Sequence, residues 1–328
     1  MTRANEPAGA PRIAVVGEAL IDFTAAPGAA LAFEGHPGGA PANSAIAAAR
    51  LGVATALIGQ LSTDLFGERL HAHLAANAVD LRFVLRDDAA SSTLAFVERH
   101  PDSNRYAFYT QGTADTRWCP AELPVLPQSC RWLHFGSVAL LGEPAGSRIT
   151  QLVEAEHGRR IVMFDPNARL DLLRDPTGWR ARCGHWIALT DLLKLSEEDL
   201  AVLAPGQAEE AAIGACLARG PRAVVLTRGA RGATLFRRRG EALHVRPPAI
   251  RVVDTIGAGD TFGAALMVAL LEAGVQDAAA LEGLGAPEWH GVLAFAAAAA
   301  ACNCAREGAD PPRRAEIDAL LARDHAGL

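Results

Sequence analysis

The sequence predicts an α/β fold with a mostly parallel central sheet that helices cover on both faces. Two observations predict it. Short apolar runs rich in Val, Ile and Leu recur along the 328 residues, and each is followed by a stretch of helical periodicity. Strands that alternate with helices form parallel sheets buried on both faces. Half of the residues are apolar, which suffices for the large core that such a fold requires.

The elements follow in order. A strand is expected at 13–23 (IAVVGEALIDF), then a helix over 41–51 that Gly52 ends. A second strand at 54–61 precedes a helix over 66–77. Further buried strands are expected at 131–140, 160–167, 185–190 and 223–229, with helical stretches near 146–157, 196–204 and 208–219. The last elements are a short strand at 251–253 and helices at 261–272 and 293–302.

Two regions break this rhythm. Residues 24–38 and 91–112 alternate apolar and polar residues, with a turn signal at 101–104. Such strands are half exposed, so we expect them to form a small antiparallel sheet that projects from the domain as a lid. Residues 13–328 would then be one domain carrying this insertion, and the polar residues 1–12 a disordered tail.

Composition excludes several classes of function. The net charge is −6, so no basic excess is present to displace phosphate counterions, and we expect no nucleic-acid partner. The N-terminal residues lack the apolar core of a signal peptide, and the most apolar run, 293–302, is too short to cross a membrane. The six cysteines follow no zinc or disulfide spacing. We therefore expect a cytoplasmic protein with reduced cysteines.

Residues 251–274 carry the most informative chemistry. Gly257 and Gly259 leave the backbone uncovered where a helix begins, so N–H groups there can face an anion, and the helix dipole favours negative charge at the same place. Asp260 adds a carboxylate. Amides for a transferring phosphoryl group and a base for a hydroxyl proton are what phosphoryl transfer requires. The alternative from these residues alone is a glycine-rich turn with a capping Asp. The spacing fits neither a dinucleotide fingerprint nor a Walker-type loop.

Two segments carry a family resemblance. DTIGAGDTFGAA (254–265) resembles the C-terminal signature of the ribokinase-like (PfkB-type) sugar kinases, and HPGGAPANSAIAAARLG (36–52) is similar to their N-terminal Gly-Gly signature. The likeness runs from about residue 13 to 312. It implies a ribokinase-like three-layer sandwich with a small antiparallel β-lid, and an enzyme that transfers the γ-phosphoryl group of ATP to a sugar hydroxyl.

The resemblance also implies roles for single residues. Asp260 would be the general base, and Gly257, Ala258 and Gly259 would form the anion hole. In the sugar site, glycines would allow close backbone approach, and polar side chains would bind vicinal hydroxyls. The residues carried over for the sugar are Asp22, Gly38, Gly39, Asn43 and Arg169. Without the resemblance, Asp22 reads equally as a solvated acid at a strand end.

The nucleotide and metal sites are implied less strongly. LTRGARGATLF (226–236) resembles the nucleotide-binding segment, and DLLKLSEEDL (191–200) is similar to a stretch that assists Mg²⁺ in relatives. The nucleotide residues carried over are Lys194, Thr227, Gly229, Gly232 and, for the adenine pocket, Asn303. Lys194 can alternatively be a solvated lysine. Asp199 would assist Mg²⁺ through water, although a helix N-terminus capped by Ser196 explains the same residues. Asp254 and the Ile256 carbonyl match positions that bind K⁺ in relatives.

The substrate follows from several further segments. GEALIDF, WLHFGSVALLGEPA (132–145) and FDPNARLDLL (164–173) look most like those of bacterial fructokinases, which implies conversion of D-fructose to fructose 6-phosphate. A 2-keto-3-deoxygluconate kinase, or another sugar or nucleoside kinase of the family, stays open. So does, as a different class, a non-catalytic sugar-binding regulator. The family also implies a homodimer formed through the lids, for which Phe96, Phe108 and Tyr109 are candidates. The alternative role of these three residues is to line the sugar pocket.

Overall fold

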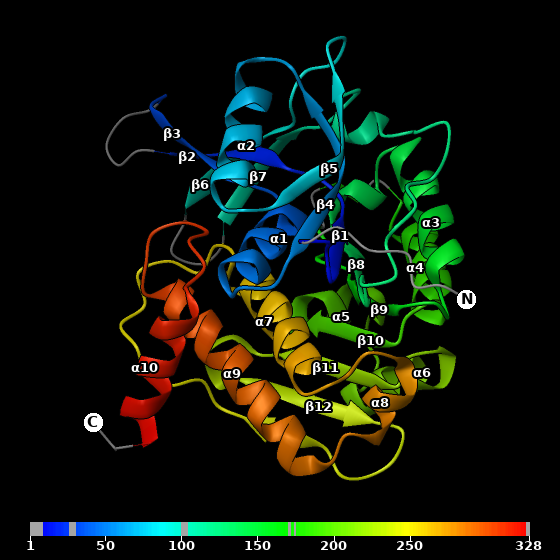
Figure 1. Ribbon diagram of the computed structural model, residues 1–328, viewed down its shortest axis with the longest axis vertical. Helices are drawn as coiled ribbons and strands as arrows, with labels where there is room; N and C mark the ends of the chain where they lie inside the picture. The colour runs from blue at the N-terminus through cyan, green and yellow to red at the C-terminus, as the bar shows by residue number, and fades with distance from the viewer. Residues whose placement is uncertain (1–8, 26–30, 100–103, 170–171, 174, 326–328) are drawn as a thin grey trace.

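Nine strands form the central sheet of the computed structural model, which describes residues 9–25, 31–99, 104–169, 172–173 and 175–325 (Figure 1). In spatial order they are β13 (Leu243–Val245), β12 (Ala233–Arg237), β11 (Ala223–Thr227), β10 (Leu192–Ser196), β9 (Ile161–Asp165), β8 (Trp132–Gly136), β1 (Ile13–Val16), β4 (Thr55–Ser62) and β5 (Asp80–Asp87). The strands from β11 to β5 pair in parallel, and β12 and β13 add an antiparallel edge. The predicted mostly parallel sheet is confirmed.

Helices cover both faces of this sheet. Alternation along each strand sends successive side chains to opposite faces, so Ile13 and Val15 join one core and Ala14 and Val16 join the other. The first core is covered by α1 (Ala40–Arg50), α2 (Leu65–Ala76), α7 (Ala258–Glu272), α8 (Ala278–Gly283), α9 (Ala286–Cys304) and α10 (Arg314–His325). The second is covered by α3 (Ala145–Glu156), α4 (Pro176–Ala188), α5 (Glu197–Leu203) and α6 (Glu209–Arg219). The three-layer sandwich is therefore present.

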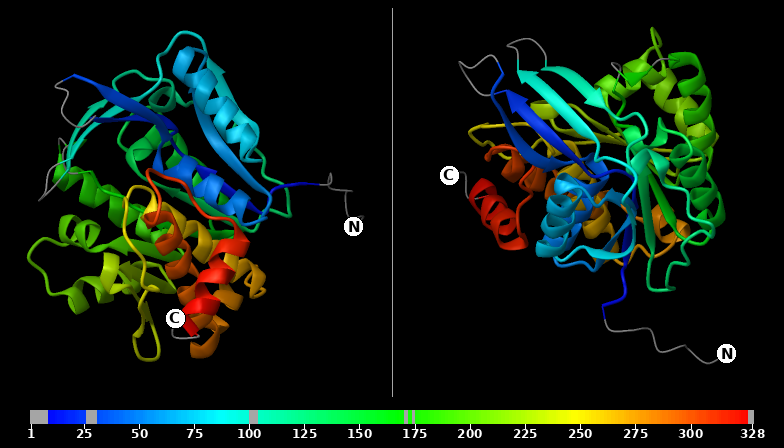
Figure 2. Two further views of the ribbon diagram at one scale, coloured as in Figure 1. Left: turned by 90° about the vertical axis from the view of Figure 1, so that its left-hand side faces the viewer. Right: turned by 90° about the horizontal axis from the view of Figure 1, so that it is seen from above.

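A second sheet projects from one side of this body (Figure 2). Its strands, in spatial order, are β3 (Phe33–Gly38), β2 (Leu20–Ala25), β6 (Leu94–Arg99) and β7 (Asn104–Tyr109). β2–β3 and β6–β7 are antiparallel pairs, as predicted, while β2 and β6, which come from separate parts of the chain, pair in parallel. We call this four-stranded sheet the lid sheet. Parts of the predicted insertion, 26–30 and 100–103, lie outside the described residues.

Three sequence-based element assignments are wrong. The run 13–23 is two strands in different sheets, because the chain leaves the central sheet after Val16 and enters the lid sheet at Leu20. Residues 185–190 end helix α4 and its turn rather than forming a strand, since a short apolar run fits a buried helix equally well. Residues 251–253 form no strand, and α7 starts at Ala258, three residues before the predicted start.

Part of each end of the chain lies outside the described residues. Residues 1–8 of the predicted tail are not among the described residues, whereas Arg12 is hydrogen-bonded into the sheet through its amide and the Ala54 carbonyl at 2.7 Å. Order therefore begins before residue 13. Within the described part of the chain, none of the helices combines the length and apolar character required to span a bilayer.

Candidate active site

A cavity of about 860 Å³ opens at the carboxyl ends of the parallel strands, where it also meets the lid sheet. Ligand sites of open α/β sheets form at this edge, because the loops that follow parallel strands converge there. Its volume suits a nucleotide together with a small substrate. The predicted residues that line it are Asp22, Gly39, Asn43, Arg169, Lys194, Asp199, Thr227, Gly229, Gly232, Ile256, Gly257, Ala258, Gly259 and Asp260. Most of the predicted site is thus gathered in one place.

The turn before α7 forms one wall of the cavity. Gly257 precedes the helix with φ +73°, a left-handed conformation that glycine adopts without strain. A side chain there would also collide with Ala309, because a Cβ on Gly257 would stand 2.7 Å from the Ala309 Cβ. The Ala258 amide donates to the Thr255 carbonyl at 3.2 Å, so it is used within the turn. The amides of the next residues, Gly259 and Asp260, start a helix and have no partner inside it. They are the groups best placed to receive an anion.

Asp260 lies in the first turn of α7 and faces α1. Its Oδ2 accepts a hydrogen bond from Asn43 Nδ2 at 2.9 Å. Burial raises the pKa of Asp260 to about 6, while the Asn43 hydrogen bond and the Lys194 charge oppose that rise. A carboxylate with a pKa near neutral is suited to general-base work.

The lid sheet and the start of α1 carry most of the residues predicted to bind the sugar. Asp22 points from β2, and burial raises the pKa of Asp22 to about 7, with Arg169 lowering it and Asp260 raising it further. Gly38 does not line the cavity; a Cβ at Gly38 would stand 2.0 Å from Asp22 Oδ2. Gly38 therefore makes room for the Asp22 carboxylate, and its own contact with the sugar stays a prediction.

The residues predicted to bind the nucleotide lie at β10, β11 and the short 3₁₀ helix η4 (Gly229–Arg231). Thr227 ends β11, and its hydroxyl donates to the Leu195 carbonyl at 3.2 Å. Lys194 is only 4% exposed and binds Asp165 Oδ2 at 2.7 Å, so the alternative of a solvated lysine is wrong. Lys194, Thr227, Gly229 and Gly232 all line the cavity.

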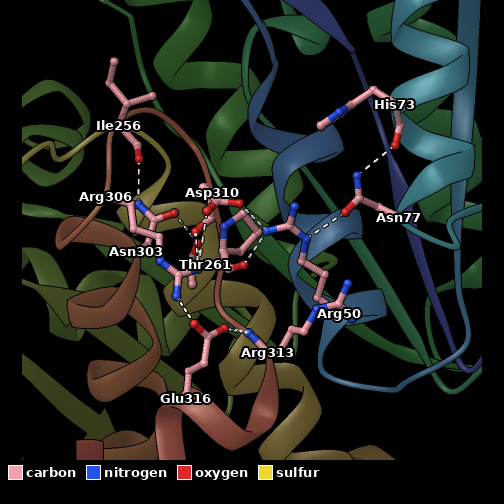
Figure 3. Close-up of polar contacts among 11 residues, drawn as sticks. Arg50, His73, Asn77, Ile256, Thr261, Asn303, Arg306, Asp310, Arg313 and Glu316 are labelled. Carbon is pink, nitrogen blue, oxygen red and sulfur yellow. Dashed lines mark hydrogen bonds and ion pairs between the residues drawn. The ribbon is translucent and has the colours of Figure 1, made fainter.

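Asn303 is buried beside the turn that precedes α7. Its side chain is 0% exposed, and its Nδ2 donates to the Ile256 carbonyl at 2.7 Å, while Thr261 donates to its Oδ1 at 3.4 Å (Figure 3). It does not line the cavity. Asn303 therefore supports the turn before α7, against which the alanine-rich helix α9 packs, and its role in the adenine pocket stays a prediction.

The predicted K⁺ ligands, Asp254 and the Ile256 carbonyl, also lie at the turn that precedes α7. Asp254 Oδ1 accepts from the Thr255 and Ile256 amides, and its Oδ2 accepts from the Gly308 amide at 3.0 Å. The segment after Gly308 is held in turn by Arg50, which donates to Asp310 and to the Pro311 carbonyl (Figure 3). Asp254 and the Ile256 carbonyl thus lie together under the turn.

Asp199 forms the capping box of α5. Its amide donates to Ser196 Oγ, and its Oδ2 accepts from the Ser196 amide at 2.8 Å, as the helix-cap alternative predicts. Asp199 nevertheless lines the cavity, and so does the exposed Glu198, which sequence reasoning missed. Two adjacent carboxylates at one helix start are oxygen donors of the kind that Mg²⁺ prefers.

Sequence reasoning also missed other residues of the cavity wall, among them Glu18, Ser137 and Asn167. Ser137 and Asn167 have positive φ angles (67° and 40°), which is uncommon for residues other than glycine. Glu18 holds Ser137 in place. Its carboxylate accepts hydrogen bonds from Ser137 Oγ at 2.7 Å and from the Ala139 amide at 3.1 Å. Only the position of Asn167 and Ser137 just after apolar strand runs could have singled them out.

Comparisons with known proteins agree with this geometry. The sequence profile of the "pfkB family carbohydrate kinase" group matches residues 10–316. A fructokinase of Rhizobium leguminosarum bv. trifolii is 36% identical over 256 residues, 77% of this chain and 78% of that protein. The solved structure of a fructokinase from Xylella fastidiosa with bound ATP matches with a TM-score of 0.86 and 28% identity, covering 95% of this chain and 98% of that one.

A double mutant of a Vibrio cholerae fructokinase, solved in a form with bound fructose, ADP and potassium ion, matches with a TM-score of 0.83 and 27% identity. The match covers 95% of this chain and 98% of that one. With both signature segments meeting in one cavity and the profile spanning nearly the whole sequence, this chain belongs to the pfkB family of carbohydrate kinases.

Proposed function

We propose that the protein is an ATP-dependent fructokinase that converts D-fructose to fructose 6-phosphate, with Asp260 as the general base. The observation that carries the proposal is the 2.9 Å hydrogen bond between Asn43 and Asp260, which puts the sugar-binding signature and the phosphoryl-transfer signature in one cavity. The relatives named fructokinase support the choice of substrate.

In this reaction Asp22, Gly39 and Asn43 bind the sugar hydroxyls and turn the 6-hydroxyl toward Asp260. Asp260 accepts the hydroxyl proton while the oxygen forms its bond to the γ-phosphorus, and the bond from that phosphorus to the ADP oxygen breaks. The Gly259 and Asp260 amides, at the positive end of the α7 dipole, stabilise the charge that develops on the phosphoryl oxygens. Closure of the lid sheet over the sugar would exclude water and limit hydrolysis of ATP.

We propose that the nucleotide lies along Lys194, Thr227, Gly229 and Gly232, with Mg²⁺ as the accompanying metal. Asp199 and Glu198 would hold Mg²⁺ through water, and the ion would supply positive charge beside the ATP phosphates. Both Asp199 oxygens already accept protein hydrogen bonds, which favours contact through water over direct ligation.

K⁺ is a further component of the proposal. The Ile256 carbonyl and the Asp254 carboxylate accept protein donors, but carbonyl and carboxylate oxygens keep a second lone pair for a cation. A relative solved with potassium ion supports this choice. Activity is expected to be higher in potassium chloride than in choline chloride of equal ionic strength, and equal activity in the two salts would count against a K⁺ site.

We propose also that the protein is a cytoplasmic homodimer. All six cysteines are free, which fits a reducing compartment. Phe96 stacks on Phe23 on the outer face of the lid sheet, beside Phe33 and the 63% exposed Tyr109, whereas Phe108 faces the cavity. This aromatic face suits pairing with the lid of a second copy. Light scattering of the purified protein should give twice the chain mass, and Tyr109→Glu should lower it to one.

The substrate is tested by an ADP-release screen over fructose, ribose, adenosine and 2-keto-3-deoxygluconate. Fructose should give the highest kcat/KM. The second candidate is the acid sugar, because Arg169 lines the cavity near Asp22 and could bind a carboxylate. Preference for 2-keto-3-deoxygluconate would transfer the assignment to that substrate, and sugar binding without ADP release would indicate a regulator.

A further inference from the structure

Lys194 is the only lysine among the 31 lysine and arginine residues of the sequence. All the other residues in this count are arginines. Arginine supplies the cation in ion pairs such as those of Arg50, Arg86, Arg228 and Arg314. An ammonium differs from a guanidinium in being a compact point charge that fits a small space. The one place where the chain uses a lysine ammonium is a buried position at the edge of the cavity.

The ammonium of Lys194 lies beneath the start of α7. Its Nζ is 2.7 Å from Asp165 Oδ2 on the neighbouring strand β9. A Cβ on Gly259 would stand 3.1 Å from the same Nζ, so only the absence of a side chain at Gly259 lets the ammonium come so near the turn. A longer, planar guanidinium would not fit this space without moving the turn.

Asp165 connects this ammonium to the base. Its Oδ1 is buried and has no hydrogen-bond partner among the described residues, and the same is true of His134 Nδ1. Both residues line a small void of about 10 Å³ that Asp260 also lines. The void has the size and polar lining for one water molecule. Asp165 therefore lies between the Lys194 ammonium on one side and a space shared with Asp260 on the other.

The negative charge of Asp165 keeps Lys194 protonated. Burial alone would lower the pKa of Lys194, but the carboxylates of Asp165 and Asp199 outweigh burial and raise it. An isolated ammonium in such a place would lose its proton, because desolvation of an unpaired charge is costly. With Asp165 beside it, Lys194 stays charged at neutral pH.

We propose that Lys194 and Asp165 are a positioning pair for the phosphoryl transfer: Asp165 fixes the ammonium beneath Gly259, and the ammonium supplies the positive charge that Asp260 and the incoming phosphoryl group face. This inference rests on the proposed kinase function. It concerns how Lys194 acts on the turn and on Asp260, in addition to the contact with the nucleotide proposed above.

The pair has a consequence for Asp260 that can be measured. The groups around Asp260 are the donor Asn43 on α1, the cations Lys194 and Arg169, the acids Asp165 and Asp22, and neutral His134 across the void. Removing the Lys194 charge leaves Arg169 as the remaining cation of this set. The pKa of Asp260 should then rise by about one unit or more, the usual effect of losing a close opposite charge.

The first test is the pH dependence of kcat/KM for the sugar in Lys194→Met and Lys194→Arg. Lys194→Met should move the acid limb upward by about one pH unit and lower kcat by roughly 10²-fold, the scale of one lost charge-stabilising group. Lys194→Arg keeps the charge, so its limb should stay within a few tenths of a unit while kcat falls. Arg82→Met on β5, far from the cavity, is the matched charge-removal control and should move neither quantity.

The second test does not require activity. Because Lys194 is the only lysine, protein grown with lysine labelled with ¹⁵N at Nζ gives one side-chain signal in the full chain. That signal should show a protected ammonium across pH 6–9 and should shift on addition of ADP with magnesium and aluminium fluoride. In Asp165→Asn the protection should be lost.

Each result either supports or overturns the proposed role of the Lys194–Asp165 pair. An acid limb that stays in place in a folded Lys194→Met protein overturns it, and so does a lysine signal typical of an exposed amine. If Lys194→Met does not fold, the labelled wild-type protein and Asp165→Asn still decide. Failure of the kinase proposal looks different: the wild-type protein would phosphorylate no sugar while its lysine signal stays protected.

Discussion

Asn43 Nδ2 and Asp260 Oδ2 lie 2.9 Å apart although 217 positions separate them in the sequence. Asn43 is on the helix that follows the Gly-Gly segment, and Asp260 is in the first turn of α7. The two helices α1 and α7 pack in the same core, which fixes this distance. The residue that would hold the sugar and the residue that would take its proton therefore form one rigid unit.

Replacing Asn43 should affect binding and ionisation together. Asn43→Ala removes the hydrogen bond that lowers the pKa of Asp260, so the acid limb of kcat should move to higher pH. It also removes a donor to the sugar, so KM for fructose should rise about tenfold, the worth of one good hydrogen bond. Steady-state kinetics from pH 5.5 to 8.5 measure both effects, and a change in KM alone would show that Asn43 does not tune the base.

The wild-type activity should fall in mild acid. Asp260, with a pKa raised to about 6, must be ionised to accept a proton, and Asp22, with a pKa raised to about 7, must be ionised to accept hydroxyl hydrogen bonds. Both groups take up protons as the pH falls, so kcat/KM should decline between pH 7.5 and 5.5. In Asp22→Asn the upper of the two ionisations should disappear. An unchanged kcat/KM down to pH 5 would contradict these assignments.

Gly38→Ala should weaken sugar binding without affecting the nucleotide. The added Cβ would stand 2.0 Å from Asp22 Oδ2, so the carboxylate must turn away from its present position. KM for fructose should rise by about tenfold or more, on the scale of a hydrogen bond to a charged group. KM for ATP serves as the internal control and should stay within twofold. Equal increases in the two KM values would indicate general damage to the fold.

Asp64→Ala should destabilise the base of the lid sheet. Asp64 caps α2 by accepting from the Phe66 and Gly67 amides, and it also accepts from the amide and hydroxyl of Ser92, just before β6. The loss should be about 1–2 kcal/mol, the usual value of an N-cap. Thermal or urea unfolding measures it, with Asp88→Ala at an exposed position as the control.

The pH dependence of that loss has a defined sign. Hydrogen bonds from Gly67 and Ser92 overcome the opposing effect of burial and lower the pKa of Asp64 in the folded state. A carboxyl group with a lowered folded-state pKa stabilises the fold above its unfolded pKa, and the benefit is lost as the pH falls through the folded value. The difference in stability between wild type and Asp64→Ala should therefore be full at pH 7 and shrink in acid.

Much of this architecture was predictable because its signals are local. The parallel strands are continuous apolar runs, and the α7 turn needs glycine at Gly257 for its positive φ. Gly38 could not be interpreted from sequence, because its contact with Asp22 depends on the pairing of β2 with β3. The contact of Asn303 with the Ile256 carbonyl was not predictable for the same reason, because it depends on the rotation of α9 against α7.

The Asp165–Lys194 pair is the clearest example of a contact that the sequence does not predict. Each residue lies within an apolar strand run, and only the order of β9 and β10 in the sheet brings them together. The void beside His134 likewise depends on the ends of β8 and β9, the start of α1 and the first turn of α7, which no single stretch of sequence encodes.

The most direct measurement is the turnover of fructose and ATP by Asp260→Asn, with binding of both followed by calorimetry. Asn has the shape of Asp but cannot accept the proton, so turnover should fall by about 10²–10⁴-fold, the usual contribution of a general base. Fructose should still bind, and the melting temperature should stay near that of the wild type. Near-normal turnover by a folded Asp260→Asn protein would contradict the assignment of Asp260 as the base.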